Sequence, residues 1–106
     1  MIARVWSART TQAKSQLYLQ HFSSAVVPAL RSFGGYVSSS VLTRSGESGF
    51  EILVLTVWES ISAIDAFAGS DREAAVVTPE AATLLTDYDR RVRHFEVAST
   101  DGLSFG

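Results

Sequence analysis

The sequence predicts an α+β fold in which a four-stranded antiparallel sheet carries two helical regions on one face. Three observations lead to this prediction. Four short segments are rich in β-branched and aromatic residues, as strands are. Two longer segments between them carry apolar residues at helical spacing. The elements follow the order β-α-β-β-α-β, which a single antiparallel sheet with helices on one face accommodates.

The first strand is predicted over Ile2–Arg9, a short segment that contains Val5 and Trp6. A helical region is predicted next, over Thr11–Phe33, because apolar residues recur there every three or four positions. These residues are Leu19, Phe22, Val26, Leu30 and Phe33. We expect this helix to bend near Pro28, which has no backbone N–H to donate, and to end at Gly34-Gly35.

The second and third strands are predicted over Tyr36–Thr43 and Phe50–Trp58, with a polar hairpin turn at Arg44–Gly49 between them. The third strand is apolar on both faces. One face carries Phe50, Ile52, Val54, Thr56 and Trp58, and the other carries Leu53, Leu55 and Val57. Because two helices cover only one face of a sheet, the other face needs a second cover. A second copy of the same sheet is the simplest one, so we expect a homodimer.

The region Ser60–Asp89 is predicted to be helical in pieces. Ser70 with Glu73 resembles a capping box, and Thr78-Pro79 is typical of an N-cap followed by proline at the first helical position. The last strand is predicted over Arg91–Ala98. Together these elements form a ferredoxin-like βαββαβ fold, and two copies packed sheet against sheet form a dimeric α+β barrel. Residues 1–99 are assigned to this single domain and residues 100–106 to a loose C-terminal segment.

Composition excludes several classes of function. The chain has 106 residues, a net charge of −2 and no cysteine. A slightly acidic chain has no electrostatic reason to bind nucleic acid or an anionic membrane. Thiol chemistry is excluded, and two distant histidines give no metal-ligand spacing, so we expect neither a metal nor a cofactor. The first residues lack the apolar segment of a signal peptide and no run spans a bilayer, which predicts a cytoplasmic protein.

Two stretches carry a family resemblance. The run Ile52–Ser60, followed by Ala63–Asp71, resembles the strand-to-helix segment of the antibiotic biosynthesis monooxygenase superfamily of dimeric α+β barrels. His94–Val97, with Val76–Glu80 before it, is similar to the small bacterial branch of that superfamily. The resemblance covers nearly the whole chain. It implies a dimer with a pocket between helices and sheet in each subunit and, in the enzymatic members, O2 chemistry on aromatic polyketides or on haem.

The two enzymatic branches place their functional residues differently. In the haem-degrading branch a Trp and a His on the second helix serve haem, and these positions fall on Phe67 and Val77. The Asn that this branch has on the first strand is missing near Trp6. In the polyketide-oxidising branch an Asn, a Trp and a Tyr line the pocket, and their positions fall on Val54, Trp58 and Ile64.

His94 and Trp58 are the residues with the clearest chemical use. The imidazole of His94 is a candidate general base for a phenolic or enolic proton, and its alternative is a strand histidine hydrogen-bonded into the structure. Trp58 is a candidate stacking surface for a flat aromatic molecule, and its alternative is a core residue with a bonded indole N–H. Arg4 either neutralises an anion or pairs with a carboxylate, and His21 either reaches the pocket or faces water.

We therefore expect a homodimeric, cofactor-independent monooxygenase that acts on a small electron-rich aromatic such as a phenol, a quinol or an anthrone. His94 is the predicted catalytic base. The predicted substrate-binding residues are Trp58, Phe67, Val54, Ile64, Trp6 and Tyr36. The alternative is a non-catalytic ligand-binding or structural dimer on the same fold, and a haem-degrading oxygenase ranks last.

Overall fold

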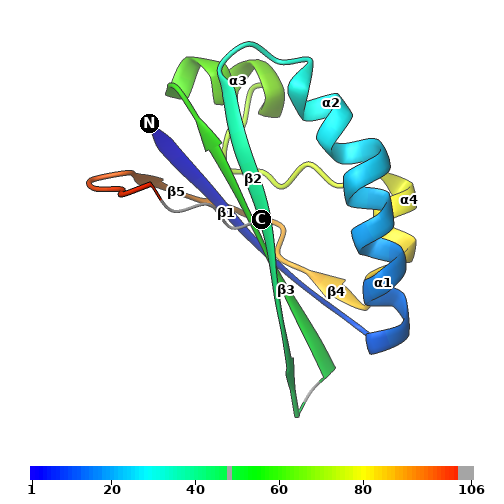
Figure 1. Ribbon diagram of the computed structural model, residues 1–106. Helices are drawn as coiled ribbons and strands as arrows, with labels where there is room; N and C mark the ends of the chain where they lie inside the picture. The colour runs from blue at the N-terminus through cyan, green and yellow to red at the C-terminus, as the bar shows by residue number, and fades with distance from the viewer. Residues whose placement is uncertain (48, 103–106) are drawn as a thin grey trace.

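The computed structural model describes residues 1–47 and 49–102, and it has the predicted α+β architecture (Figure 1). Its sheet contains β1 (Ile2–Thr10), β2 (Tyr36–Gly46), β3 (Gly49–Trp58), β4 (Asp87–Tyr88) and β5 (Arg93–Glu96). Its helical elements are α1 (Gln12–His21), a π-helical segment η1 (Phe22–Val26), α2 (Val27–Arg31), α3 (Ile61–Ala68) and α4 (Pro79–Thr83). The predicted C-terminal segment 100–106 lies partly outside the described residues, which end at 102.

The strand order is β2-β3-β1-β4, and β5 continues the same edge by pairing with β1. Every pairing is antiparallel, and β1 pairs with β3 along its whole length, from Ile2 opposite Trp58 to Thr10 opposite Phe50. This order confirms the ferredoxin-like prediction. The register of β1 and β5 also places His94 directly opposite Arg4.

The first helical region is interrupted earlier than predicted. Its backbone stays right-handed throughout, but Phe22–Val26 forms wider π-helical turns, and Pro28 lies in the first turn of α2. Proline lacks an N–H and its ring crowds the carbonyl four residues before it, so a wider turn just upstream accommodates it. The hydroxyls of Ser23 and Ser24 both donate to the backbone carbonyl of Gln20, so this carbonyl next to the wider turns has hydrogen-bond partners.

The chain after β3 is less helical than predicted. Helix α3 begins after the N-cap Ser60, and α4 begins after Thr78 with a proline in its first turn, as expected. The capping box predicted at Ser70 is wrong, because residues 69–78 form a turn and irregular chain and no helix starts there. The carboxylate of Asp71 accepts the N–H of Glu73 instead, in a local turn. The end of the predicted helical region is the short strand β4, which pairs with β1.

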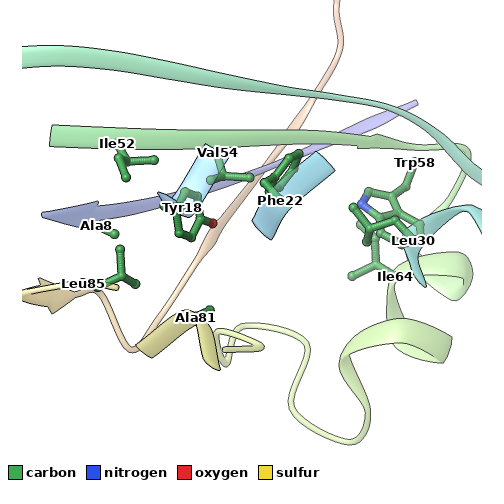
Figure 2. Close-up of a cluster of buried hydrophobic side chains, with 10 residues drawn as sticks. All are labelled: Ala8, Tyr18, Phe22, Leu30, Ile52, Val54, Trp58, Ile64, Ala81 and Leu85. Carbon is green, nitrogen blue, oxygen red and sulfur yellow. The ribbon is translucent and has the colours of Figure 1, made fainter. Parts of the chain in front are cut away.

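The core lies between the sheet and the helices that cover one of its faces (Figure 2). Alternate side chains of β3 enter it, and Ile52 and Trp58 are fully buried there. At the end of the first helical region the chain turns sharply at Gly35, which has a φ of 87°. A Cβ at Gly35 would stand 2.5 Å from the Cβ of Ala63, so both the backbone angle and the space require glycine.

No helix of residues 1–47 and 49–102 lies over the other face of the sheet, and Figure 1 shows α1, α2 and α4 together on one side. Leu53, Leu55 and Val57 of β3 point to this open face and are only partly buried. Leu42 on β2 and Phe95 on β5 keep 41% and 48% of their surface exposed. The doubly apolar third strand is therefore confirmed, with one face in the core and one face open. No helix among the described residues is long and apolar enough to cross a membrane.

Candidate functional site

A cavity of about 270 Å³ lies between the first helical region and the covered face of the sheet. Its wall is mainly apolar. The helical side contributes Tyr18, His21, Phe22, Ala25, Val26, Ala29 and Leu30, and the strands contribute Arg4, Trp6, Val54 and Thr56. The remaining sides are closed by Phe67 of α3, by Val92 and by five residues between Val76 and Ala81, namely Val76, Val77, Thr78, Glu80 and Ala81. A pocket of this kind suits a small, largely apolar molecule.

Arg4 is the cation in the wall of this cavity, and only 5% of its surface is exposed. Its Nη1 donates to the carbonyl of Arg72, and its Nη2 donates to the carbonyl of Ala74 at 2.9 Å. The guanidinium also lies over the ring of Phe67, 5.5 Å from the centroid. Within residues 1–47 and 49–102 no carboxylate pairs with Arg4. Burial lowers the pKa of Arg4, yet a guanidinium stays charged in proteins.

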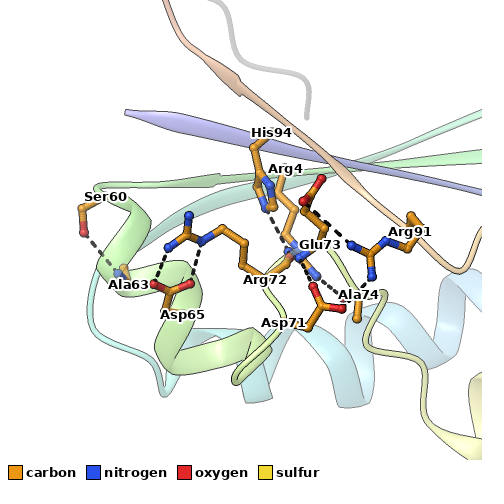
Figure 3. A network of polar contacts seen from close by, with 10 residues as sticks. All are labelled: Arg4, Ser60, Ala63, Asp65, Asp71, Arg72, Glu73, Ala74, Arg91 and His94. Atoms are coloured by element: carbon orange, nitrogen blue, oxygen red, sulfur yellow. Dashed lines mark hydrogen bonds and ion pairs between the residues drawn. The ribbon is translucent and has the colours of Figure 1, made fainter.

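His94, the predicted base, lies beside Arg4 and outside the set of residues that line the cavity (Figure 3). Its Nε2 is 2.9 Å from Nη1 of Arg4. Because a guanidinium only donates, this nitrogen must accept and the ring must be neutral. Burial, and then the charge of Arg4, lower the pKa of His94 below its usual 6.5. The lone pair that a base would use is therefore bonded to Arg4.

Acidic pH is expected to destabilise the protein through His94. A group whose pKa is lower in the folded state than in the unfolded state takes up a proton on unfolding. Its contribution is complete above pH 6.5 and is lost as the pH falls through the folded pKa. Urea midpoints of the wild type should fall between pH 8 and pH 5 more steeply than those of His94→Gln, whose amide does not titrate. Equal slopes in the two proteins would contradict the lowered pKa of His94.

Residues 70–78, which we call the wall segment, link α3 to α4 and form one side of the cavity. Side chains from three places hold this segment (Figure 3). Arg4 bonds its carbonyls, Arg72 within it makes two 2.8 Å bonds to Asp65 of α3, and Arg91 bonds Asp71 at 2.6 Å. The last pair lowers the pKa of Asp71, because the carboxylate accepts from Arg91. Arg4 therefore belongs both to the cavity and to the scaffold of its wall.

Three of the six predicted substrate-binding residues line the cavity, namely Trp6, Val54 and Phe67. Trp6 is also anchored, because its Nε1 donates to the carbonyl of Asp89 at 2.8 Å. The other three, Trp58, Ile64 and Tyr36, are not among the lining residues. A binding role for any of the six stays a prediction, but only the first three are in position for direct contact with a molecule in the cavity.

Trp58 lies behind Phe67 in the core rather than at the cavity surface. Its exposed fraction is 0%, and its Nε1 donates to Oγ1 of Thr56 at 2.9 Å. Its ring centroid is 5.2 Å from that of Phe67 and 5.5 Å from that of Tyr36. This is the arrangement of the alternative reading, a core tryptophan with a bonded indole N–H. Trp58 packs against the wall residue Phe67 from the core side and does not itself line the cavity.

Sequence reasoning left several wall residues out of the predicted site, above all Tyr18, His21 and Phe22. Their signal was the apolar stripe of the first helical region, on which Phe22 lies next to His21. Burial raises the pKa of Tyr18 to about 12, so its hydroxyl is a hydrogen-bond donor at neutral pH. In the part of the chain that the structure describes, no three His, Asp or Glu side chains form a group that could hold a metal ion.

Comparison with known proteins assigns the chain to a family. The profile named antibiotic biosynthesis monooxygenase matches residues 1–79. The chain belongs to this family. The match includes β1, β3, α3 and the wall segment, so it covers most of the residues around the cavity. None of the curated proteins matches the sequence.

Solved structures of family-like proteins share the fold at low identity. A candidate antibiotic biosynthesis monooxygenase from Bacillus cereus has a TM-score of 0.64 and 18% identity, with 99% of this chain and 98% of that one covered. The haem degrader MhuD from Mycobacterium tuberculosis, solved with two haems in its active site, has a TM-score of 0.60 and 20% identity, with 96% of this chain and 100% of that one covered. SnoaB, a cofactor-independent oxygenase from Streptomyces nogalater, has a TM-score of 0.56 and 13% identity, with 96% of this chain and 95% of that one covered.

The two positions at which the family resemblance implies a haem-binding Trp and His do not carry these residues. The position of the iron-ligating histidine is occupied by Val77, and Val77 lines the cavity as an aliphatic side chain. The position of the haem-contacting tryptophan is occupied by Phe67, which packs on Trp58 and on Phe33. His94 does not replace the ligand, because its Nε2 is bonded to Arg4. No reaction step is therefore assigned to haem.

Proposed function

We propose that the protein is a cofactor-independent monooxygenase for a small electron-rich aromatic, of the phenol, quinol or anthrone type. The observation that carries the proposal is Arg4, a buried guanidinium without a carboxylate partner in the described residues, set in the wall of an apolar cavity. An apolar wall favours a flat neutral ring, and the guanidinium favours that ring once it becomes an anion. Membership of the monooxygenase family supports the same reaction class.

The reaction needs only the substrate and O2. The substrate loses a proton, and its carbanion-like anion transfers one electron to O2. The two radicals combine into a C–O–O bond, and protonation gives a hydroperoxide. Loss of water then leaves a ketone, so that one oxygen atom enters the product and the other leaves as water. The part of the protein is to keep water out, to hold the ring against wall residues such as Trp6 and Phe67, and to stabilise the anion with Arg4.

For His94 we propose a positioning role in place of the predicted role as base. The support is its 2.9 Å contact with Nη1 of Arg4, together with a neutral ring that imposes no second positive charge there. The two N–H groups of Nη1 then donate to His94 and to the carbonyl of Arg72, and together these bonds fix the orientation of the guanidinium. His94→Gln, which keeps an acceptor, should then retain much more activity than His94→Leu.

The experiment that tests the function is O2 uptake with anthrone as substrate. The purified protein, without added cofactor and in the presence of a chelator, should consume one O2 for each anthraquinone formed, above the rate of spontaneous oxidation. Anthraquinone should inhibit, because it occupies the same cavity. Saturable binding of anthrone without any enhanced O2 uptake would reject the enzyme and leave the non-catalytic ligand-binding dimer as the function.

We also propose that the open face of the sheet joins two copies of the chain. The support is the row Leu53, Leu55 and Val57 with Leu42 and Phe95 beside it, all on the face without helices. A sheet-on-sheet interface of this kind buries on the order of 2,000 Å² in total. The second copy would complete the dimeric α+β barrel.

Light scattering at micromolar concentration should give about twice the chain mass of 11.5 kDa. Leu55→Lys should give the mass of one chain, because the variant places a charge in the centre of the proposed interface and the dimer should not form. Leu17→Lys is the matched control, since Leu17 is 51% exposed on α1 and lies away from that face. A monomeric wild type, or equal masses for the two variants, would reject the dimer.

A further inference from the structure

His21 is a polar group in the cavity that the proposed reaction has not yet used. It is the last residue of α1, and it lines the cavity next to Phe22. Its Nε2 is buried and has no hydrogen-bond partner among the described residues. Buried polar atoms in proteins are nearly always bonded, and one that is not calls for an explanation, of which a catalytic role is one. The π-helical segment η1 starts directly after it, and such segments are frequent at functional sites.

The other ionisable residues in the wall are poor proton acceptors. These are Arg4, Tyr18 and Glu80. Arg4 only donates, and the pKa of about 12 keeps the hydroxyl of Tyr18 protonated at neutral pH. Glu80 is exposed in the first turn of α4, and a carboxylate is a much weaker base toward a phenol than an imidazole is. The imidazole is the side chain that accepts and returns a proton near neutral pH.

We propose that His21 is the general base of this site and that the ligands of the cavity carry a weakly acidic hydroxyl that hydrogen-bonds to its Nε2. The inference rests on the proposed function for the reaction that follows deprotonation. The O–H bond of the phenol, or of the enol tautomer in the case of anthrone, breaks, its electron pair stays on the substrate, and the proton moves to Nε2 of His21. Arg4 stabilises the resulting anion. After O2 has added, the imidazolium returns the proton to the terminal oxygen of the peroxide, which restores the neutral ring.

Proton transfer to His21 is measurable without any oxidation. The probe is 4-nitrophenol, whose phenolate absorbs at longer wavelength than the phenol, under nitrogen and at a pH below the midpoint of the free probe. Binding to the wild type should raise the phenolate fraction. In protein with ¹⁵N-labelled histidine, the ring nitrogens of His21 should shift toward imidazolium on binding, while those of His94 stay at their neutral positions. The methyl ether, 4-nitroanisole, should bind without either change.

His21→Gln is the decisive variant, because its side chain keeps polarity and similar size but does not take up the proton. It should lower kcat/KM for anthrone by two to four orders of magnitude and remove the acidic limb of the pH profile. It should still bind 4-nitroanisole like the wild type. Gln20→Ala is the matched control on the same helix, since Gln20 is exposed, and it should leave rate and pH profile unchanged.

The outcomes separate this inference from the proposed function. If anthrone is not oxidised but 4-nitrophenol still gives its proton to His21, the base is supported and the monooxygenase is rejected. If anthrone is oxidised and His21→Gln retains the wild-type rate and pH profile, His21 is rejected as the base while the monooxygenase stands. Tight one-to-one binding of ferric haem that is lost in His21→Gln would make Nε2 an iron ligand and would overturn the inference.

Discussion

Arg4→Ala is expected to lower kcat for anthrone oxidation by about two to three orders of magnitude, the usual loss when one donor to a developing anion is removed. In this site the guanidinium is the cation that faces the cavity, and the change removes its charge from an environment with little water. Steady-state O2 uptake over a range of anthrone concentrations measures the effect. We expect the change in kcat to exceed the change in KM, because the neutral substrate gains less from the charge than the anion does.

The same variant should also lose stability, since the carbonyls of Arg72 and Ala74 lose their donors. A buried acceptor without a partner costs about 1–3 kcal/mol. Arg9→Ala is the control on the same strand. Arg9 bonds Asp87 and Asp89 at the surface, where such pairs contribute at most about 1 kcal/mol, and it does not line the cavity. Arg4→Lys keeps the charge, so partial rescue of kcat by lysine would assign the effect to charge rather than to folding. An Arg4→Ala protein with full activity would contradict the proposed site.

Trp58→Ala is expected to destabilise the fold by about 3–5 kcal/mol, the range for removal of a fully buried large aromatic side chain. The ring is 0% exposed and packs on Phe67 and Tyr36, so its removal leaves a cavity in the core. Because domains of this size have about 5–15 kcal/mol in total, the variant should be only marginally folded. Urea titration followed by circular dichroism measures the difference.

Trp58→Phe and Trp6→Ala complete this experiment. The first should be less destabilising than Trp58→Ala, because it keeps an aromatic ring in the core, although it loses the bond from Nε1 to Thr56 and the volume of the second ring. The second removes a tryptophan that lines the cavity, so it should weaken ligand binding more than it affects folding. If Trp58→Ala stayed fully stable and lost only ligand affinity, Trp58 would be a stacking surface as first predicted, and the placement in the core would be wrong.

The sequence was sufficient for the parts of the fold that depend on local pattern. The alternation along β3 predicted both its buried face and its open face, and the Thr78-Pro79 pair predicted the start of α4. It was less informative where tertiary contacts override local preference. The wall segment has a sequence typical of a helix start at Ser70, but the bonds of its carbonyls to Arg4 and of Asp71 to Arg91 hold it in a non-helical conformation. The short strand β4 depends in the same way on its pairing with β1.

The site was harder to predict because its key contacts join residues far apart in the chain. Arg4 and His94 become neighbours only through the register of β1 and β5, which no local pattern determines. A histidine in a strand is therefore a reasonable base on sequence grounds, and its partner becomes visible only in the structure. Similarly, the strand periodicity places Trp58 on the covered face but does not say that Phe67 lies between it and the cavity.

The way the wall segment is held has a consequence for how ligands enter. Two of its attachments, Arg72 with Asp65 and Arg91 with Asp71, are ion pairs with both side chains about half exposed, and dissolved ions screen such pairs. The attachment through Arg4 is buried and is screened far less. Raising the ionic strength should therefore favour local opening of this one side of the cavity while the sheet keeps its protection against amide exchange. The segment would act as the entry route, and ligand on-rates and off-rates would both rise with salt even where the affinity changes little.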